Sequence, residues 1–309
     1  MHAGDCTFKY ACIIPTYNGL KDLERLITSI KEQTLSTDIL VVDSSSTDGT
    51  HEFALQTANQ VVQISASQFN HGGTRQYMAE MFPEYDIFIY LTQDAYLATP
   101  DALIQLVREF KNEKVAAVCG RQLPHIDANP IAAHARLFNY PSTSHVRSAQ
   151  DIPTKGIKAA FMSNSFSAYR RTALLDVGGF PSNVILSEDM YVAAKMILNG
   201  WLIAYEGTAQ CHHSHNYTLV EEAKRYFDIG AFFSEQRWLL ESFGSPKGEG
   251  KRFVISELFY LSKNAPSAIP HALIRVFLKL TFYNMGKKQK FIPRIFKKKL
   301  SMHKNYWKN

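Results

Sequence analysis

The sequence predicts an α/β fold in which a mostly parallel sheet is flanked by helices and followed by a helical, basic C-terminal extension. Short apolar, β-branched runs alternate with segments of helical periodicity through the first half of the chain, which is typical of βαβ units. The runs are apolar on successive residues, as strands are when helices cover both faces of a sheet. Several runs end abruptly in polar residues, and such sheets bind ligands beyond the carboxyl ends of their strands.

Spacing locates the elements of the first half. Leu23, Leu26 and Ile27 recur at helical intervals after the first apolar run, which closes at a Pro-Thr-Tyr-Asn-Gly segment. The second run, 38–42, is apolar and β-branched and is followed by Asp43. We predict strands at 10–15, 38–42, 60–64, 86–91 and 115–119, with helices at 20–34, about 50–58, 72–82 and 100–111.

The second half is less regular. Residues 122–157 carry Pro, His, Asn and Ser without clear periodicity, which predicts a long loop region. Ser187 is a good N-cap for a helix at 186–199. We also predict a strand passing into a turn at 159–169, a strand at 201–205 and a long amphipathic helix at 220–243, and we divide the chain at residues 1–220 and 221–309.

Composition excludes several classes of protein. A chain of 309 residues with 46% hydrophobic residues can bury a large core. No stretch reaches about 18 uninterrupted apolar residues, so we expect no membrane span. The first residues show neither a basic nor an apolar segment, so we expect no secretory signal. The four cysteines form no Cys-x-x-Cys pair, which favours free thiols in a reducing cytoplasm.

The net charge of +6 hides a strong asymmetry. Residues 258–309 contain 12 Lys or Arg and no Asp or Glu, whereas the first 257 residues contain 22 basic and 28 acidic residues. Between 271 and 299 the basic residues alternate with apolar ones such as Phe277 and Phe291. This pattern favours binding to an anionic membrane surface without spanning it. A solvated basic helix packed on the domain is the structural alternative.

Side chains that could carry chemistry follow several predicted strands or begin a helix. An Asp-Gly after a strand is often only a turn, and acidic residues in the first turn of a helix are common. Taken together and in this order, however, they fit the transfer of a group from a nucleotide diphosphate. The set is Asn18, Asp43, Asp48, Arg75, Gln93, Asp94, Glu188, Asp189, His213 and His215.

The ordered set resembles the inverting family 2 glycosyltransferases of the GT-A fold over roughly residues 10–215. The matching motifs are Pro15-Thr16-Tyr17-Asn18, Val42-Asp43-x4-Asp48-Gly49, Asp94 and Glu188-Asp189. Further segments resemble bacterial rhamnosyltransferases that build O-antigen or related surface polysaccharide. These are Gln68-Phe-Asn-His-Gly-Gly-Thr-Arg75, Leu91-Thr-Gln-Asp-Ala95, His213-Ser-His-Asn-Tyr217, Lys299-Leu-Ser-Met302 and Tyr306-Trp307.

The resemblance implies a nucleotide-sugar and acceptor-binding catalytic domain at residues 1–220 and a membrane-associating extension at 221–309. It implies dTDP-L-rhamnose as the donor, with another, UDP-linked sugar as the alternative. It implies a lipid-linked saccharide as the acceptor. The enzyme would then work in the cytoplasm, at the inner face of the bacterial cell membrane.

The resemblance also implies donor-binding roles. Asp43 would accept a hydrogen bond from the pyrimidine imide N–H, which only an acceptor can satisfy, although it could instead cap its own turn. Asp48 would support that loop or touch the nucleotide. Arg75 follows a glycine pair at a predicted helix start and would meet phosphate, unless it is a plain surface residue. The set is completed by Pro15, Thr16, Tyr17, Asn18 and Gln93.

Asp94 is the main candidate for a metal ligand. The family usually shows an Asp-x-Asp motif at this point, whereas this chain has Gln93-Asp94-Ala95, so one carboxylate remains. Mg²⁺ often takes only one or two protein carboxylates together with substrate phosphates and water. His213 or His215 could add a ligand, which would favour Mn²⁺. A zinc site built from Cys211 and its neighbours is disfavoured, because such close neighbours cannot easily converge on one ion.

Asp189 is the candidate general base. An inverting transfer needs a carboxylate near the acceptor hydroxyl, and a helix N-terminus fixes its direction and favours its ionised form. Glu188 would orient the acceptor or the loop. The structural alternative is that both residues only open a helix.

Two other classes fit less well. A nucleic-acid-binding protein would use the basic tail but would leave Asp43, Asp94 and Asp189 without a role and close to phosphates, so we expect no nucleic-acid partner. A nucleotidyltransferase normally shows a glycine-rich phosphate loop after its first strand, and a dinucleotide dehydrogenase shows Gly-x-Gly-x-x-Gly, and neither is present here.

Overall fold

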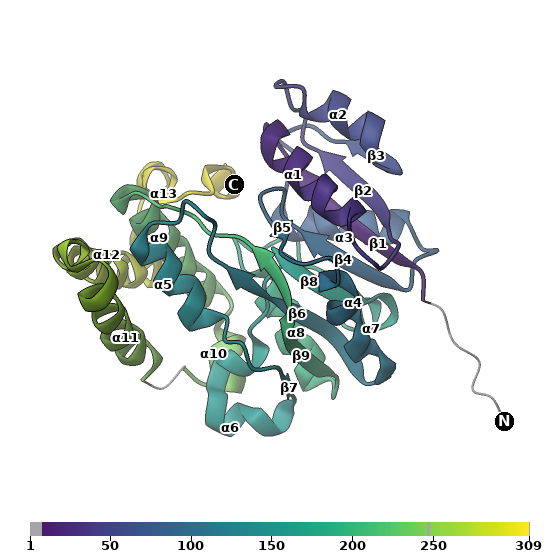
Figure 1. The fold of residues 1–309 in the computed structure, drawn as a ribbon. Helices are drawn as coiled ribbons and strands as arrows, with labels where there is room; N and C mark the ends of the chain where they lie inside the picture. Colours follow the sequence, from purple (N-terminus) through teal and green to yellow (C-terminus); the bar gives the residue numbers. More distant parts are fainter. Residues whose placement is uncertain (1–7, 246–247, 309) are drawn as a thin grey trace.

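A computed structural model describes residues 8–245 and 248–308. Cys6 and the N-terminal stretch considered for a secretory signal lie outside the described residues. The described strands form one nine-stranded mixed sheet in the order β3-β2-β1-β4-β8-β6-β9-β5, and β7 also pairs with β9 (Figure 1). The strands are β1 Tyr10–Thr16, β2 Asp38–Asp43, β3 Gln60–Gln63, β4 Ile87–Leu91, β5 Tyr96–Leu97, β6 Val115–Leu123, β7 His145–Arg147, β8 Phe166–Arg170 and β9 Leu202–His212.

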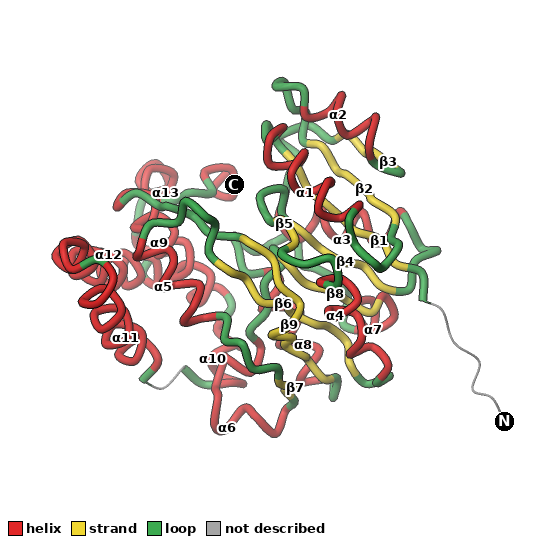
Figure 2. The backbone as a smooth tube through the Cα atoms, in the orientation of Figure 1, coloured by secondary structure: helices red, strands yellow, loops and turns green. Residues whose placement is uncertain are grey.

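Helices flank this sheet, and a group of them extends to one side of it (Figure 2). Short 3-10 turns lie at 108–111, 149–151, 156–160, 266–268, 289–291 and 304–308. The α-helices are α1 Leu20–Lys31, α2 Thr50–Thr57, α3 His71–Met81, α4 Ala102–Val107, α5 Pro130–Asn139, α6 Ile152–Lys155, α7 Arg171–Asp176, α8 Glu188–Leu198, α9 Leu219–Glu235, α10 Arg237–Phe243, α11 Glu249–Asn264, α12 Ile269–Lys287 and α13 Arg294–Leu300.

The predicted parallel arrangement is confirmed for β1, β2, β3 and β4, so their carboxyl ends meet at one edge. Successive residues of one strand enter different cores, because side chains alternate across the sheet. Ile13 packs in the cluster on one face, and Cys12 and Ile14 pack in the cluster on the other. All three are fully buried, which explains why the sequence runs are apolar throughout.

Two predictions about the second half were wrong. Residues 122–157 contain α5, β7 and α6 rather than one long loop. The start of α5 had a readable signal, because Asn129 caps it by accepting from the Ala132 N–H at 2.9 Å and Pro130 occupies its first turn. The predicted helix at 220–243 is divided at Gln236, where the backbone leaves helical geometry. The break turns α10 so that Leu239 and Phe243 enter the core.

The C-terminal helices pack closely on the rest of the molecule. α12 lies along α9, and two glycines permit the close approach, because a Cβ on Gly230 would lie 2.1 Å from the Tyr283 carbonyl oxygen and one on Gly286 would lie 2.0 Å from that of Phe227. Trp307, near the end of the chain, is buried in the main core. Residues after 220, Phe227 and Trp307 among them, therefore share one core with the strands of the sheet.

We expect Gly286→Ala to lower the free energy of unfolding by about 1–3 kcal/mol, because the added methyl group must push α12 away from α9. Urea unfolding measures the change. Gly250→Ala is the matched control, since Gly250 lies in the first turn of α11 with open space around it, and alanine there gains up to about 1 kcal/mol of helix propensity. Equal stability of the two variants would contradict close packing of α12 on α9.

Candidate active site

A cavity of about 450 Å³ opens beyond the carboxyl ends of β1, β2 and β4. Its position agrees with the edge at which open α/β sheets bind ligands. Five residues predicted for donor binding line it, namely Pro15, Thr16, Tyr17, Arg75 and Gln93. The remaining lining residues are Ser44, Ala66, Phe69, His71, Thr92 and Asn305.

Gln93 holds one wall of this cavity in place. Its Oε1 accepts from the Thr16 hydroxyl at 2.6 Å and from the Tyr17 N–H at 2.9 Å, and its Nε2 donates to the Tyr17 carbonyl at 3.3 Å. Gln93 follows β4, and Tyr17 follows β1, its neighbour in the sheet. The side chain therefore fixes the loop after β1, which leaves Tyr17 half exposed at the cavity.

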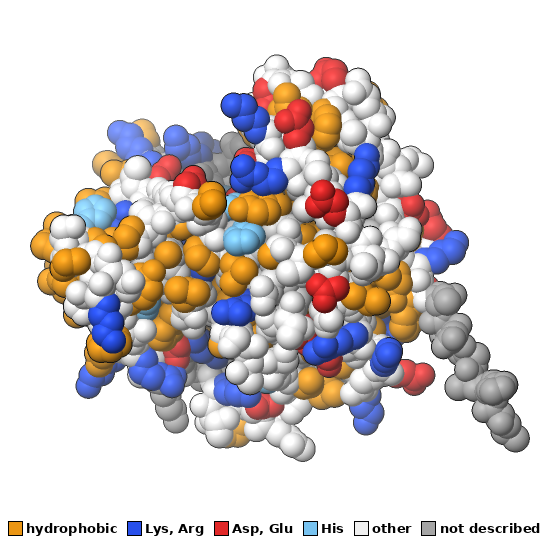
Figure 3. Space-filling view, in the orientation of Figure 1, with side chains coloured by type: hydrophobic (Ala, Val, Ile, Leu, Met, Phe, Trp, Pro, Cys, Tyr) orange, Lys and Arg blue, Asp and Glu red, His pale blue; other side chains and the backbone are white. Residues whose placement is uncertain are grey.

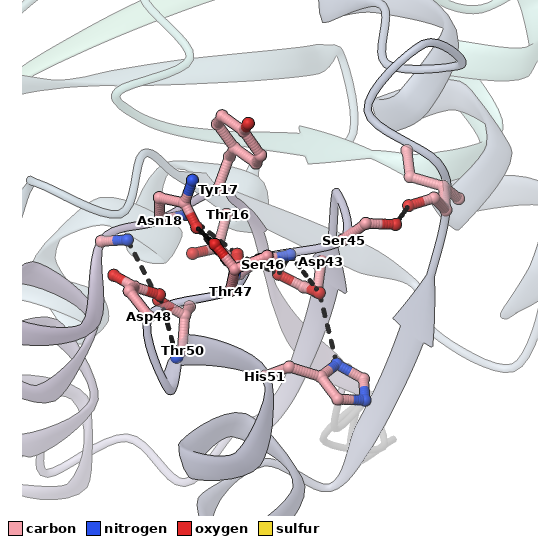
Figure 4. A network of polar contacts seen from close by, with 12 residues as sticks. Thr16, Tyr17, Asn18, Asp43, Ser45, Ser46, Thr47, Asp48, Thr50 and His51 are labelled. Carbon is pink, nitrogen blue, oxygen red and sulfur yellow. Dashed lines mark hydrogen bonds and ion pairs between the residues drawn. The ribbon is translucent and has the colours of Figure 1, made fainter.

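Asn18, Asp43 and Asp48 belong to a network beside the cavity and do not line it (Figure 4). Asp43 is 0% exposed and accepts from Ser46 Oγ at 2.5 Å and from the Ser46 N–H at 3.1 Å. The carboxylate thus caps its own turn, which was the structural alternative, and base recognition by Asp43 stays a prediction. Asn18 Oδ1 accepts from the Thr47 N–H at 2.8 Å.

Asp48 lies just before helix α2 and accepts hydrogen bonds at its start. Its Oδ1 accepts from the Thr50 hydroxyl at 2.5 Å and from the Thr50 N–H at 3.1 Å, and its Oδ2 accepts from the Leu20 N–H at 3.2 Å. The hydrogen bond from the Thr50 hydroxyl holds the pKa of Asp48 below its usual value. These contacts fit the predicted support of the loop.

Arg75 forms a buried ion pair with Glu188. Its Nη1 lies 3.1 Å from Glu188 Oε1 and also donates to the His71 carbonyl at 2.8 Å. Its buried Nε has no hydrogen-bond partner, although the side chain borders the cavity. Burial opposes ionisation of Glu188, but the charges of Arg75 and His71 outweigh it and lower the pKa of the carboxyl. Glu188 thus stays ionised as the partner of Arg75.

Asn164 links this ion pair to Asp189. Its side-chain amide donates to Glu188 Oε1 at 3.0 Å, and its backbone N–H donates to Asp189 Oδ2 at 3.1 Å. Asp189 Oδ1 accepts from the Met190 N–H at 2.7 Å, at the start of α8. Ser187 precedes the helix in a left-handed conformation and makes no capping hydrogen bond through its side chain, so that part of the prediction was wrong.

The pKa of Asp189 is raised to about 7, first by burial and then by the negative charge of Glu188, against two backbone hydrogen bonds that lower it. A carboxyl that titrates near neutrality can take a proton from a hydroxyl and release it again. Asp189 therefore has the acidity that a general base needs.

Asp94, His213 and His215 come together, as predicted for a metal site. Asp94 Oδ2 lies 3.4 Å from His213 Nε2 and 3.6 Å from His215 Nδ1, and the three ligand atoms lie within 4.8 Å of one another. Burial would raise the pKa of Asp94, but the hydrogen bond and charge of His213 lower it overall. The carboxyl is therefore in the ionised form that binds a cation.

Two further residues hold His213 in the form that binds metal. His213 Nδ1 lies 2.9 Å from Gln122 Oε1, which also accepts from Arg136 Nη1 at 2.8 Å. With a proton on Nδ1, Nε2 is the ring atom that binds a cation once it has released its own proton. Burial is the largest cause that lowers the pKa of His213, against the hydrogen bond and charge of Asp94, and burial followed by the charge of His213 lowers the pKa of His215 to about 3.

Residues 302–306 close one side of the cavity beyond β1, β2 and β4. Asn305 lines it, and the rings of His71 and His303 meet edge to face at 4.9 Å. This end is held by the Tyr306 hydroxyl, which donates to Glu235 at 2.6 Å, and by the Met302 N–H, which donates to Asp228 at 2.9 Å. The basic tail thus contributes a wall to the site.

Sequence reasoning missed four supporting residues, namely Asn164, Gln122, Arg136 and His71. Asn164 sits in a Ser-Asn-Ser segment just before β8, which reads as an ordinary turn. Gln122 lies in a region that was predicted to be a loop. Neither position carries a local signal for its contact, because the partners lie 24 and 91 residues further along the chain.

Comparison with known proteins gives the same reading of the fold and its family. Residues 11–178 match the family model "Glycosyl transferase family 2". Over 97% of this chain and 96% of each relative, the sequence is 48% identical to the O-antigen chain rhamnosyltransferase RfbN of Salmonella typhimurium and 46% identical to the O-antigen chain rhamnosyltransferase WbaN of Salmonella anatum.

Solved structures share the fold at low sequence identity. The mannosyltransferase PcManGT from Pyrobaculum calidifontis, solved with GDP-Man and Mn²⁺, aligns with a TM-score of 0.55 at 18% identity over 97% of this chain and 85% of that one. S. aureus TarS 1–349 with UDP-GlcNAc aligns with a TM-score of 0.53 at 15% identity over 91% of each chain. The family match and the two nearly full-length relatives show that this chain belongs to glycosyl transferase family 2.

Proposed function

We propose that the protein is an O-antigen chain rhamnosyltransferase that transfers L-rhamnose from dTDP-L-rhamnose to a saccharide on a lipid carrier. The observation that carries the proposal is the identity of 46–48% to two O-antigen chain rhamnosyltransferases along nearly the whole chain. The aligned length covers 97% of this chain, so the likeness extends beyond the nucleotide-binding half.

The donor lies in the cavity beyond β1, β2 and β4. Tyr17 and Thr16 border the nucleotide, and Gln93 keeps their loop in place. The guanidinium of Arg75 borders the cavity and supplies a positive charge toward the phosphates, while its Nη1 remains on Glu188. Asp43 would reach the pyrimidine only if its carboxylate left Ser46 and His51, its partners in the turn.

Asp189 acts as the general base. It takes the proton of an acceptor hydroxyl as that oxygen forms a bond to the anomeric carbon of the sugar. The bond from the anomeric carbon to the phosphate oxygen breaks, and dTDP leaves with the electron pair, so the configuration inverts. Glu188 and Asn164 orient the carboxylate through the contacts described above.

Asp94, His213 and His215 would hold a divalent cation, Mg²⁺ or Mn²⁺. The donor set fits, because one carboxylate oxygen and two imidazole nitrogens lie within 4.8 Å of one another, and Gln122 Oε1 beside His213 Nδ1 leaves Nε2 as the ligand atom of that ring. Two nitrogen ligands favour Mn²⁺ over Mg²⁺. When bound, the cation stabilises the negative charge on the diphosphate leaving group.

A binding screen tests the donor. The protein is titrated with dTDP-L-rhamnose, UDP-sugars and GDP-mannose, each with Mg²⁺ and with Mn²⁺. We expect dTDP-L-rhamnose to bind at least about ten-fold more tightly than the others, a difference of about 1.4 kcal/mol. Preference for a UDP-sugar would retain the transferase and change its substrate, and salt-sensitive DNA binding without nucleotide-sugar binding would reject the proposal.

The membrane surface is contacted by the outer faces of α11, α12 and α13. Apolar side chains gather over α11 and α12 at the left edge of the space-filling view (Figure 3). Exposed lysines such as Lys263, Lys287 and Lys288 accompany them. No helix among the described residues is long and apolar enough to cross a membrane. The exposed apolar residues are Ile255, Phe259, Leu273, Ile274, Phe277, Leu280, Phe291, Ile295 and Phe296.

Replacing Phe259 and Phe277 together with Asp is expected to weaken binding to phosphatidylglycerol vesicles by at least about ten-fold, because two buried aromatic contacts are lost and two like charges are added. Vesicle sedimentation measures it. Leu55→Asp is the control, since Leu55 is as exposed, at 61% against 63% and 68%, but lies on α2. Unchanged sedimentation of the double variant would place the membrane contact elsewhere.

A further inference from the structure

A second cavity, of about 270 Å³, lies between α5, α9, α11 and α12 and borders His215 of the candidate metal cluster. Its lining carries four cationic side chains, Arg136, Arg225, Arg275 and Lys279, against the single carboxylate of Glu222. A cavity with this excess of positive charge is suited to an anion.

The charges inside the cavity are only partly compensated. Arg275 and Lys279 share Glu222, with Lys279 Nζ at 2.9 Å from Glu222 Oε1. Arg275 also donates to the Tyr217 carbonyl, and it is almost fully buried. Arg225 is exposed and stacks over the Tyr217 ring at 6.0 Å. Lys279 also interacts with the buried carboxyl of Glu257, so the charges of Arg275 and Lys279 are largely compensated. The charge on Arg225 remains available to a ligand.

The cavity borders two features: the helices α11 and α12, which carry the exposed apolar residues, and His215 of the candidate metal cluster. Arg275 and Lys279 lie one turn apart on the inner face of α12, while Phe277 and Leu280 lie on its exposed outer face. α11 repeats this pattern, with Phe253 lining the cavity and Phe259 exposed. His215 also lines the cavity. A ligand in it would lie between the inner faces of α11 and α12 and the candidate metal cluster.

We propose that this cavity binds the diphosphate through which the acceptor saccharide is attached to its lipid carrier. The proposal rests on the proposed function, because it needs a lipid-linked acceptor. A diphosphate is multiply charged at neutral pH, and guanidinium groups bind phosphate oxygens through paired, charge-assisted hydrogen bonds. Its lipid would leave toward the apolar outer faces of α11 and α12, and its saccharide would extend toward the catalytic edge.

Arg225→Gln is the variant that tests the site with little disturbance of the fold, because Arg225 is exposed and contributes no hydrogen bond within the described residues. Transfer is measured to two acceptors that carry the same saccharide, one on an isoprenyl diphosphate and one on a neutral alkyl chain. We expect the KM for the diphosphate acceptor to rise by about ten-fold, as loss of a charge-assisted contact predicts, with the KM values for the neutral acceptor and the donor unchanged.

Arg237→Gln is the matched control, since Arg237 is an exposed arginine on α10 that does not line the cavity. It should behave as wild type with both acceptors. An equal effect of Arg225→Gln on both acceptors, or no effect on either, would overturn the diphosphate assignment and leave the transferase intact.

Calorimetry tests diphosphate binding in this cavity independently of turnover. The full chain, with its donor site filled by dTDP, is titrated with geranyl diphosphate, inorganic pyrophosphate and geraniol. We expect geranyl diphosphate to bind, geraniol not to bind, and Arg225→Gln to weaken geranyl diphosphate by about ten-fold. This result without transfer to any acceptor would reject the proposed function alone. Binding of pyrophosphate but not of geranyl diphosphate, or loss of phosphatidylglycerol vesicle binding in Arg225→Gln, would overturn the proposal in favour of a free phosphate or a lipid headgroup.

Discussion

Asp189→Asn is expected to reduce turnover by about 10²–10⁴-fold, the usual contribution of a general base, while the affinity for dTDP stays at the wild-type value. The amide has the shape of the carboxylate but cannot take a proton from the acceptor hydroxyl. Steady-state transfer and titration with dTDP measure the two quantities separately. Asp101→Asn, on an exposed aspartate that precedes α4, is the control. Turnover near the wild-type value in Asp189→Asn would exclude Asp189 as the base.

The pH dependence of turnover is a second test of Asp189 as the general base. Burial and the charge of Glu188 raise the pKa of Asp189 to about 7, so the carboxyl is protonated below that pH and cannot accept the proton. Turnover should therefore rise with pH up to about 7 and then level off. The residual activity of Asp189→Asn should lack this rise. A flat wild-type profile between about pH 5 and 8 would contradict the assignment.

Glu188→Gln separates the two neighbouring acids. Glu188 is buried against Arg75, so the substitution leaves a buried guanidinium without its counter-charge and should lower the free energy of unfolding by about 3–5 kcal/mol. Asp189→Asn removes no ion pair but turns an amide NH2 toward one of two backbone N–H donors, so it should lower the free energy of unfolding by about 1–3 kcal/mol, less than Glu188→Gln. A larger loss of stability in Glu188→Gln and a larger loss of turnover in Asp189→Asn would separate the two proposed roles.

The part of the site that could be predicted follows from strand ends. Parallel strands bring their carboxyl ends together, so Thr16 and Gln93 were expected at one edge, and both line the cavity. Asp43 shows the limit of that reasoning. Its place after β2 was predictable, but whether its oxygens face solvent or its own turn depends on Ser46, three residues further on, and the structure turns them inward.

The contacts of His213 and of the C-terminal helices could not be predicted from strand ends. The pairing of His213 with Gln122 depends on β6 and β9 lying side by side in register, and this joins segments 91 residues apart. The basic tail presented a similar difficulty. Its composition suggested one surface, but Arg275 and Lys279 turn inward while Phe277 between them faces out. Whether a residue faces inward or outward depends on its position around the helix axis. That position can be assigned only once the bounds of the helix are known.

Chelation by EDTA is expected to lower transfer by at least about 100-fold, because the negative charge that develops on the leaving group loses several kcal/mol of stabilisation. Added Mn²⁺ should restore it. Asp94→Ala should need a higher Mn²⁺ concentration for half-maximal activity, since the only carboxylate of the cluster is lost. Full activity in EDTA would exclude a metal role for Asp94.

Binding of Mn²⁺ itself, followed by electron paramagnetic resonance of the free ion, tests the ligands without reference to turnover. His213→Ala should weaken Mn²⁺ binding by at least about ten-fold, and Gln122→Ala by about ten-fold, because that amide holds the Nδ1 proton and so directs Nε2. His212→Ala is the matched control. Its ring stacks on Tyr96 and its Nδ1 lies 2.8 Å from the Pro124 carbonyl, so it should leave Mn²⁺ affinity unchanged. If His212→Ala and His213→Ala weaken binding equally, the cluster of Asp94, His213 and His215 is not the site that holds the ion.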